Sequence, residues 1–262
     1  MGKIIPYVLL IGGESFNYDG YCFQPPTLQH IIKDNEGENY NLYLYYSFLL
    51  SCSKEDIIDM VGAKERYDKL SFELQNELTK YKLLLLSGGE QILQEAIQFF
   101  VKDKVVFNEK DGCFFLYSNN DKVTKIIDNS NFIEFCNYVN QINCRDTIEE
   151  DEPIENITFS SEKAKQRYIE LQKRKKQFNK NKAKSKEGNA NFDLGNVIAK
   201  LSAKTNSPYN LTNIYNLTVF QLYDQFYQII QNNQIDGYVL KWAAWGSEEF
   251  DFSLWYNNNK TK

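Results

Sequence analysis

Val105-Val-Phe-Asn-Glu-Lys-Asp-Gly-Cys-Phe-Phe-Leu-Tyr117 is the stretch that decides the fold class. Two runs of β-branched and aromatic residues flank Asp111-Gly112, a dipeptide that adopts the positive φ angles of a tight hairpin turn. The pattern predicts strands over residues 105–107 and 113–117, and residues 122–127 have the composition of a third strand. We therefore expect a small antiparallel sheet within a chain whose other segments are mostly helical.

Helical spacing of apolar residues dominates the chain before this sheet. Pro25 and Pro26 exclude a helix before them, and Thr27 can cap one that follows over residues 28–33. Ser53, with Asp56 three residues later, marks a second start. Further helices are predicted over the ranges 38–50, 65–86 and 90–101. Residues 7–11 are expected to form a short buried strand, a candidate further member of the sheet.

The chain after the sheet changes sharply in charge. A helix is predicted from Ser130 to about Ile142, and an acidic stretch follows over residues 146–159. Between Lys163 and Lys186, eleven basic residues and one acidic residue give a charge of +10 within 24 residues. The net charge of the whole chain is −5, so the remainder carries −15. This polarity is the strongest electrostatic feature of the sequence.

The last region has helical patterns again. Asp193 can cap a helix over residues 194–204, and Thr218 with Gln221 forms a capping-box pattern that opens one over 219–231. A further helix is predicted over 236–245, ended by Gly246. We therefore predict an α+β, predominantly helical fold with three regions: a mixed α+β domain (1–150), an acidic then basic connector that is partly helical (151–190), and a helical domain (191–262).

The composition argues against several kinds of chemistry. His30 is the only histidine, which excludes a multi-histidine metal site, and the five cysteines contain no C-x-x-C pair. The glycine-rich phosphate-binding patterns are missing, and the carboxylate clusters lack the spacing of a calcium loop. We expect a non-enzymatic protein with no metal and no cofactor. We also expect no signal peptide and no membrane segment, which predicts a cytoplasmic location.

Two groups of residues are candidate binding sites. The aromatic residues of the last region exceed what a small helical core needs, so they either fill that core or form a face for a partner; the candidates are Tyr223, Phe226, Tyr227, Trp242, Trp245 and Trp255. The basic segment either binds phosphates of a nucleic acid or is a solvated stretch that contacts acidic parts of this chain or of a neighbouring subunit. Its central residues are Lys173, Arg174, Lys175 and Lys176.

Two segments resemble a known family. Gln24-Pro-Pro-Thr-Leu-Gln-His-Ile-Ile with Gly37-Glu-Asn-Tyr-Asn-Leu-Tyr-Leu, and Asn216-Leu-Thr-Val-Phe-Gln-Leu-Tyr-Asp-Gln-Phe with Ala243-Ala-Trp-Gly, are similar to the opening and to a C-terminal helix of tail assembly chaperone-like proteins. These proteins come from tailed phages and prophages of low-GC bacteria, where they are encoded between the major tail protein and the tape-measure protein.

The resemblance implies a role in tail assembly within the cytoplasm of an infected bacterium. The partner would be the tape-measure protein or another tail protein, and a homo-oligomer is an open possibility. A tape-measure protein is a long apolar helical chain that must stay soluble before the tail tube polymerises around it. Two alternatives remain open at this point: a nucleic-acid-binding accessory protein that acts through residues 163–186, and a structural component of the tail.

Overall fold

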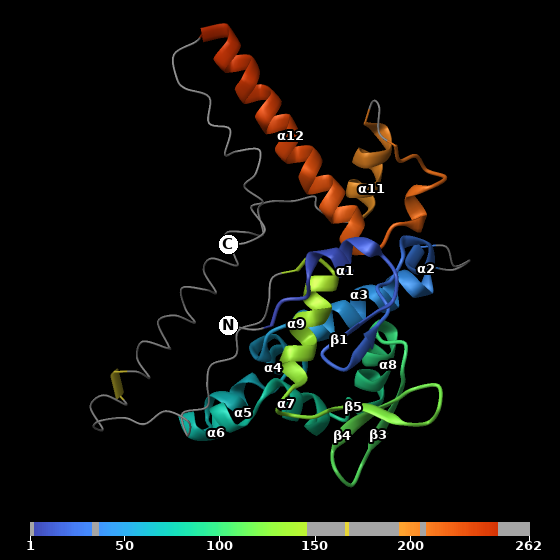
Figure 1. Ribbon diagram of the computed structural model, residues 1–262. Coiled ribbons are helices and arrows are strands. Elements are labelled where there is room, and N and C mark those ends of the chain that lie inside the picture. Colours follow the sequence, from blue (N-terminus) through green and yellow to red (C-terminus); the bar gives the residue numbers. More distant parts are fainter. Residues whose placement is uncertain (1–2, 33–36, 146–165, 168–193, 205–207, 246–262) are drawn as a thin grey trace.

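The computed structural model describes residues 3–32, 37–145, 166–167, 194–204 and 208–245. Its fold is α+β and predominantly helical, as the sequence predicts. Figure 1 shows a body of short helices from which one long helix, α12, projects. A three-stranded sheet lies at the end of the body remote from the tip of α12.

The predicted three-stranded sheet is confirmed. It consists of β3 (Lys104–Asn108), β4 (Cys113–Tyr117) and β5 (Val123–Ile127), antiparallel in the order β3-β4-β5. In the turn between β3 and β4, Gly112 has a φ of 58°, the left-handed conformation that the Asp-Gly signal predicts, whereas Asp111 does not have a positive φ. One face of the sheet carries Phe114 and Ile127 into the core, where neither side chain is exposed.

A second hairpin precedes Pro25 and Pro26, and it was not predicted from the sequence. Strands β1 (Phe16–Tyr18) and β2 (Tyr21–Phe23) are joined by Asp19 and Gly20, whose φ angles are 50° and 82°. Two consecutive positive φ angles are those of a type I′ turn. The same Asp-Gly signal occurs here as at residues 111–112, but each strand has only three residues, too few to show an alternating pattern.

The strand predicted over residues 7–11 is wrong, because this segment is helix α1 (Tyr7–Gly12). Pro6 precedes the first turn, and Gly13 ends the helix in the left-handed conformation with a φ of 72°. Only Leu10 in this helix is buried, and Val8 is 70% exposed. A proline before and a left-handed glycine after a short apolar run indicate a single helical turn rather than a buried strand.

Most of the other helices lie where the sequence predicts them: α2 (Leu28–Ile32), α3 (Glu38–Ser51), α4 (Lys54–Met60), α8 (Glu90–Phe100), α9 (Phe132–Ile142) and α11 (Leu194–Ala203). The capping box of Ser53 and Asp56 forms at the start of α4, with the Ser53 N–H donating to Asp56 Oδ2 over 2.8 Å. The start of α4 is therefore fixed by hydrogen bonds between side chains and backbone N–H groups that are close in sequence.

The single helix predicted over residues 65–86 is wrong. The structure divides it into α5 (Lys64–Asp68), α6 (Phe72–Glu77) and α7 (Lys80–Leu86). Ser71 and Thr79 are extended, and their hydroxyl oxygens accept the N–H groups of Leu74 and Lys82. Each hydroxyl therefore begins a new helix, although the apolar spacing continues across both breaks.

The two helices predicted over 219–231 and 236–245 are also wrong, because they form one helix, α12 (Val219–Trp245). Its start is preceded by a 3-10 turn, η2 (Ile214–Asn216). No proline interrupts the sequence between the two predicted helices, and Gly237 lies inside the helix. A single interior glycine costs a helix only about 1 kcal/mol relative to alanine, which does not end it.

The described parts of the first and last regions share one hydrophobic core. Its members from the body include Phe100, Phe114 and Phe135, and those from the last region include Val197 and Leu222. The connector at residues 151–190 lies almost entirely outside the described residues. Separate folding of residues 1–150 and 191–262 stays a prediction, but the two regions meet at a common core.

The contact that joins the two regions is a reciprocal pair of hydrogen bonds, which we call the clasp (residues 26–28 and 217–219). The N–H of Leu28, the first residue of α2, donates to the Leu217 carbonyl over 2.8 Å. The N–H of Val219, the first residue of α12, donates to the Pro26 carbonyl over 3.3 Å. The first N–H group of each helix therefore has its acceptor, a carbonyl in the segment that precedes the other helix.

Gln221 extends the clasp to a third helix. Its Oε1 accepts the N–H of Thr218 over 2.9 Å, and its own N–H donates to Thr218 Oγ1 over 3.2 Å, so the predicted capping box is confirmed. Gln221 Nε2 also donates to the Ile11 carbonyl near the end of α1 over 2.8 Å. A Cβ atom on Gly13 would collide with the Gln221 side chain. Gly13 is therefore required both for its φ angle and for space.

A buried polar contact fixes the other end of α1. The Tyr7 hydroxyl donates to Oδ2 of Asp224, a carboxylate that is 1% exposed. Burial and this carboxylate raise the pKa of Tyr7 to about 12. The phenol therefore stays protonated near neutral pH and keeps donating to Asp224.

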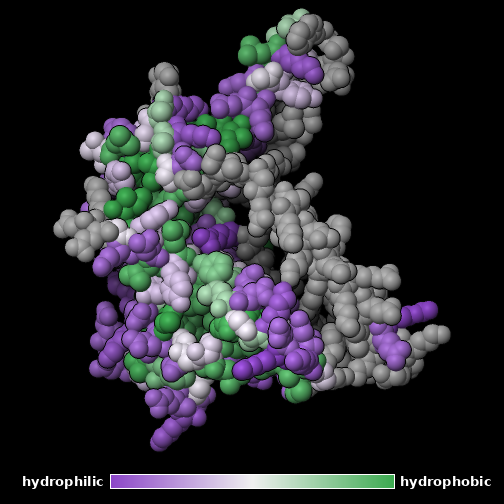
Figure 2. Space-filling view, turned by 180° about the vertical axis from the view of Figure 1, so that it is seen from behind, coloured by the Kyte–Doolittle hydropathy of each residue, from purple (hydrophilic) through white to green (hydrophobic). Residues whose placement is uncertain are grey.

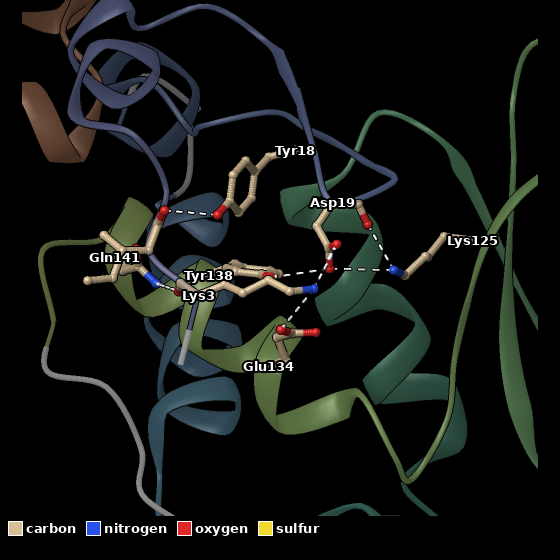
Figure 3. A network of polar contacts seen from close by, with 8 residues as sticks. Lys3, Tyr18, Asp19, Lys125, Glu134, Tyr138 and Gln141 are labelled. Atoms are coloured by element: carbon tan, nitrogen blue, oxygen red, sulfur yellow. Dashed lines mark hydrogen bonds and ion pairs between the residues drawn. The ribbon is translucent and has the colours of Figure 1, made fainter. Parts of the chain in front are cut away.

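A polar network around Asp19 holds the β1–β2 turn on the body (Figure 3). The Asp19 carboxylate accepts hydrogen bonds from Lys3 Nζ over 2.9 Å and from the Tyr138 hydroxyl of α9 over 3.2 Å. Lys125 Nζ on β5 donates to the Asp19 carbonyl over 2.8 Å and lies 4.8 Å from the ring centroid of Tyr21. The turn is therefore tied to a helix, to the three-stranded sheet and to the start of the chain.

We predict that Gly13→Ala destabilises the protein more than Gly88→Ala. Gly88 has a φ of 73°, almost the same as Gly13, but nothing lies within 4 Å of the Cβ atom that alanine would add there. The control variant should lose about 1 kcal/mol of unfolding free energy from backbone strain alone. Gly13→Ala should lose a further ~1–2 kcal/mol, because the Gln221 side chain must move and leave the partly buried Ile11 carbonyl without its donor. Chemical denaturation measures both losses, and equal values would contradict this role of Gln221.

We also predict that the stability contributed by Asp19 disappears in acid. Hydrogen bonding from Lys3, opposed by burial and helped by the charge of Lys125, lowers the pKa of Asp19 below its ordinary value of 3.8. A carboxylate whose pKa is lowered by folding stabilises the native state above its ordinary pKa, and this contribution fades as pH falls through the lowered value.

The test variant is Asp19→Asn, because asparagine also adopts the left-handed conformation that the turn needs. Its unfolding free energy should fall below that of the parent protein near pH 7, and this difference should narrow as the pH falls below 3.8, the ordinary pKa of an aspartate. Denaturant titrations at each pH measure the difference in unfolding free energy between the two proteins. A difference that does not change with pH would show that the Asp19 charge does not stabilise the turn.

Candidate partner-binding surface

Helix α3 is apolar on all sides. Nine of its fourteen residues are tyrosine, leucine or phenylalanine, and Glu38 is the one charged residue in it. Its inner side packs in the core through Tyr43, Tyr46, Leu49 and Leu50. A helix that is hydrophobic all round is normally buried all round. This helix has one side in the core and a second apolar side that faces outward.

Four large apolar residues of α3 are exposed, and we call them the α3 stripe: Leu42, Leu44, Tyr45 and Phe48. Each side chain is 40–42% exposed. Leu44, Tyr45 and Phe48 lie along the outward side of the helix, since they are three or four residues from one another or adjacent. Leu42 precedes the buried Leu49 by seven residues, so it lies on the same side as Leu49 but two turns earlier, where it is exposed. Seen from behind, the surface of the body carries several groups of hydrophobic side chains among hydrophilic ones (Figure 2).

One end of the α3 stripe is a shallow open depression. It is lined by Glu38, Asn41, Leu42 and Tyr45. The stripe covers a little less than two helical turns, or roughly 9 Å along the helix axis. Its shape and chemistry suit the apolar side of another helix better than a small polar ligand.

Polar contacts on the inner side hold α3 in place. The Tyr46 hydroxyl donates to Glu95 Oε2 of α8 over 2.9 Å, and the Tyr43 hydroxyl donates to Asn143 Oδ1 over 3.1 Å. Arg145 Nη1 donates to Ser51 Oγ over 2.9 Å. Burial raises the pKa of both tyrosines to about 12, so each stays a donor near neutral pH. The α3 stripe is therefore presented by a fixed helix.

The sequence predicted α3, but not which of its apolar residues face outward. One set of apolar residues at helical spacing is Leu42, Tyr45, Tyr46, Leu49 and Leu50. The structure buries the last three and exposes the first two. A helix with apolar residues on every side gives no periodic signal that distinguishes the core side from the outward side. No other sequence signal marks the α3 stripe.

The aromatic residues predicted on α12 do not form one surface. Phe226 is 5% exposed and lies in the core, with Lys200 Nζ 5.9 Å from its ring centroid. Tyr223 and Tyr227 lie beside each other, with ring centroids 6.5 Å apart; Tyr223 is partly buried and Tyr227 is 40% exposed. Trp242 is 47% exposed and lies about four turns further along the projecting helix.

The remaining predicted site residues lie where the structure does not describe them. Trp245 ends α12, but its side chain is outside the described residues, as is Trp255. The four central basic residues, Lys173, Arg174, Lys175 and Lys176, are also outside. Binding of a partner by these residues, or of a nucleic acid by the basic segment, stays a prediction.

The described residues contain no group of three or more histidine, cysteine or acidic side chains able to hold a metal ion. All five cysteines are free thiols, and burial raises the pKa of Cys52 and Cys113. His30 lies beside Phe99, with the ring centroids 5.5 Å apart. None of the described helices has both the length and the apolar character needed to span a bilayer.

Fold and surface together define the class: a mostly helical α+β protein with an exposed apolar helix. Comparison with known families adds one finding, a match of residues 180–260 to the family model of the YomV second domain. The matched range contains α11, η2 and α12. It supports the association with phages or prophages that the resemblance implies, and it says nothing of tail assembly. Neither a curated protein nor a solved structure matches the chain.

Proposed function

We propose that this protein is a non-enzymatic tail assembly chaperone of a phage or prophage, which binds apolar helical segments of the tape-measure protein through the α3 stripe. The observation that carries the proposal is a fixed helix with a second apolar side facing outward. The resemblance of the two sequence segments and the match over residues 180–260 support the phage association.

The size of the α3 stripe suits weak, reversible binding. Burying a large apolar side chain completely contributes about 1.5–3 kcal/mol. Each of the four side chains has about two fifths of its surface left to bury, which gives roughly 1 kcal/mol apiece. The summed free energy of burial is partly cancelled by the free-energy cost of association, so one contact of this kind is weak by itself. A chaperone that must later leave its partner requires contacts of this strength.

The segments that carry the family resemblance contribute to the clasp and to the first half of α3. Hydrogen bonds and buried side chains of the clasp stabilise the fold and leave little for a partner to contact. Residues 37–44 of the resemblance include Leu42 and Leu44 of the α3 stripe. The proposed binding depends on this helix and not on the clasp.

We predict that Leu44→Glu with Phe48→Glu abolishes the ability of this protein to keep the tape-measure protein soluble. Both side chains are more than 40% exposed, so the variant should fold, but two carboxylates would have to be buried against an apolar helix. In co-expression, the parent protein should raise the soluble fraction of tape-measure protein and co-purify with it. The variant should reduce both by about tenfold or more, the effect of losing at least 1.4 kcal/mol of binding.

The matched control is Ile4→Glu with Val8→Glu, which places the same charges on two apolar residues that are 69% and 70% exposed and lie outside the α3 stripe. This control should retain the activity of the parent protein. Unchanged aggregation of the tape-measure protein with the parent protein would overturn the proposed function. Activity retained by the α3 variant would overturn the assigned surface, and presence of the protein in purified particles would indicate a structural tail component instead.

A further inference from the structure

The three-stranded sheet is apolar on its outward side as well as on its core side. Side chains alternate along each strand, so Val105, Phe114 and Leu116 enter the core while their neighbours face outward. The register aligns Val106 with Phe115 and Phe115 with Ile126, which makes one apolar row across all three strands. We call Val106, Phe115, Tyr117, Val123 and Ile126 the outer sheet face.

The outer sheet face is exposed. Val106 is 37% exposed, and Val123 and Ile126 are each 39% exposed. Phe115 and Tyr117 are partly exposed, with ring centroids 6.3 Å apart. An antiparallel sheet with one side on the core usually carries polar residues on the other side. The outer sheet face departs from that pattern and offers an apolar surface for contact with another apolar face.

Pairing along the β3 edge of the sheet is blocked by two glutamines of α8. Gln94 Oε1 accepts the N–H of Phe107 over 2.9 Å, and Gln98 Oε1 accepts the N–H of Val105 over 2.9 Å. Gln98 Nε2 also donates to the Asp103 carbonyl over 2.9 Å. Backbone groups that would template a further strand on β3 are therefore already paired. Packing on the outer face is the mode of association that this side of the sheet leaves open.

The rim of the outer sheet face carries both signs of charge at each end. One end has Asp103, Lys104, Asp121 and Lys122, and the other has Glu109, Lys110 and Asp111. Two identical faces of this kind can meet with opposite charges opposed, without net repulsion. Because both signs are present at each end, the rim does not favour a strongly charged partner such as a nucleic acid.

We propose that the outer sheet face binds the outer sheet face of a second copy of this chain. A two-fold axis between the two sheets would bring Phe115, on the central strand, close to its counterpart and would repeat each contact symmetrically. This is the aligned packing of two sheets about 10 Å apart. The proposal does not depend on the proposed function, because α3 is not part of this face.

The contact is expected to be weak. Three strands of five residues offer a face of about 17 Å by 14 Å, or roughly 240 Å² for each copy. A stable complex buries about 800 Å² on each partner, so self-association should require a concentration well above the nanomolar range. Many copies held together along one long partner would provide such a concentration.

The experiment is sedimentation velocity of the full chain between about 10 μM and 1 mM, the range that such a small interface predicts. The parent protein should change from monomer to dimer across this range. Val106→Lys with Ile126→Lys should shift the midpoint at least about tenfold upward, since two ammonium groups would have to be buried. Val106→Thr with Ile126→Thr, which keeps β-branched residues on both strands, should produce a smaller shift in the same direction.

The matched control is Leu44→Lys in the α3 stripe, where the side chain is 41% exposed. This control should dimerise as the parent protein does. A parent protein that stays monomeric up to the highest concentration would overturn the proposal. A dimer whose midpoint is unchanged in both sheet variants would overturn it as well, because the interface would then lie on another surface. Far-ultraviolet circular dichroism checks that each variant retains its fold.

Discussion

Two helices from opposite ends of the chain are joined by a pair of hydrogen bonds on which the rest of the structure depends. In each bond, the first N–H of one helix donates to a carbonyl just before the other helix. The first amides of α2 and α12 have no acceptor within their own helices. Each donates to the carbonyl that lies two residues before the first residue of the other helix, at Leu217 and Pro26. Thr27 and Thr218 cap the two helices in the same way, each accepting an N–H three residues later. Because Leu28 and Val219 are fully buried, an amide left without its acceptor there would be costly.

The clasp also explains why the two family-like segments lie so far apart in sequence. Pro25, Pro26 and Thr27 belong to one segment, and Leu217 with Thr218 belong to the other. In the structure they form a single contact. These residues are needed to begin two helices and to join them, which is a requirement of the fold. A binding surface has other requirements, and the exposed apolar sides of α3 and of the sheet meet them without taking part in the clasp.

Local signals in the sequence predicted those features that depend on a few neighbouring residues. The capping boxes at Ser53 and Thr218 and the turn at Asp111-Gly112 are of this kind, and all three form in the structure. The breaks at Ser71 and Thr79 carried similar signals, but the apolar spacing across them favoured one long helix. Residues 7–11 were too few for spacing to decide between helix and strand, and the space that Gly13 leaves is explained by Gln221, a contact far away in sequence.

The binding surfaces were harder to predict for a related reason. On α3 every side is apolar, so the choice between Leu44 and Leu49 as the buried residue depends on where α8 and α9 pack. On α12 the aromatic residues look alike in sequence, yet Phe226 lies in the core and Trp242 on the projecting half. Exposure of an apolar residue is a property of the assembled molecule, and a single sequence carries little information about it.

Native-state hydrogen exchange at the amides of Leu28 and Val219 tests most directly whether the clasp joins the two regions into one cooperative structure. If it does, both amides should exchange only through global unfolding, with the same free energy of opening as core amides such as Ile97 and Phe114. Exchange at Leu28 and Val219 with a free energy lower by more than about 2 kcal/mol, while Ile97 and Phe114 stay protected, would contradict the account. The last region would then open on its own, and the clasp would not hold the fold together.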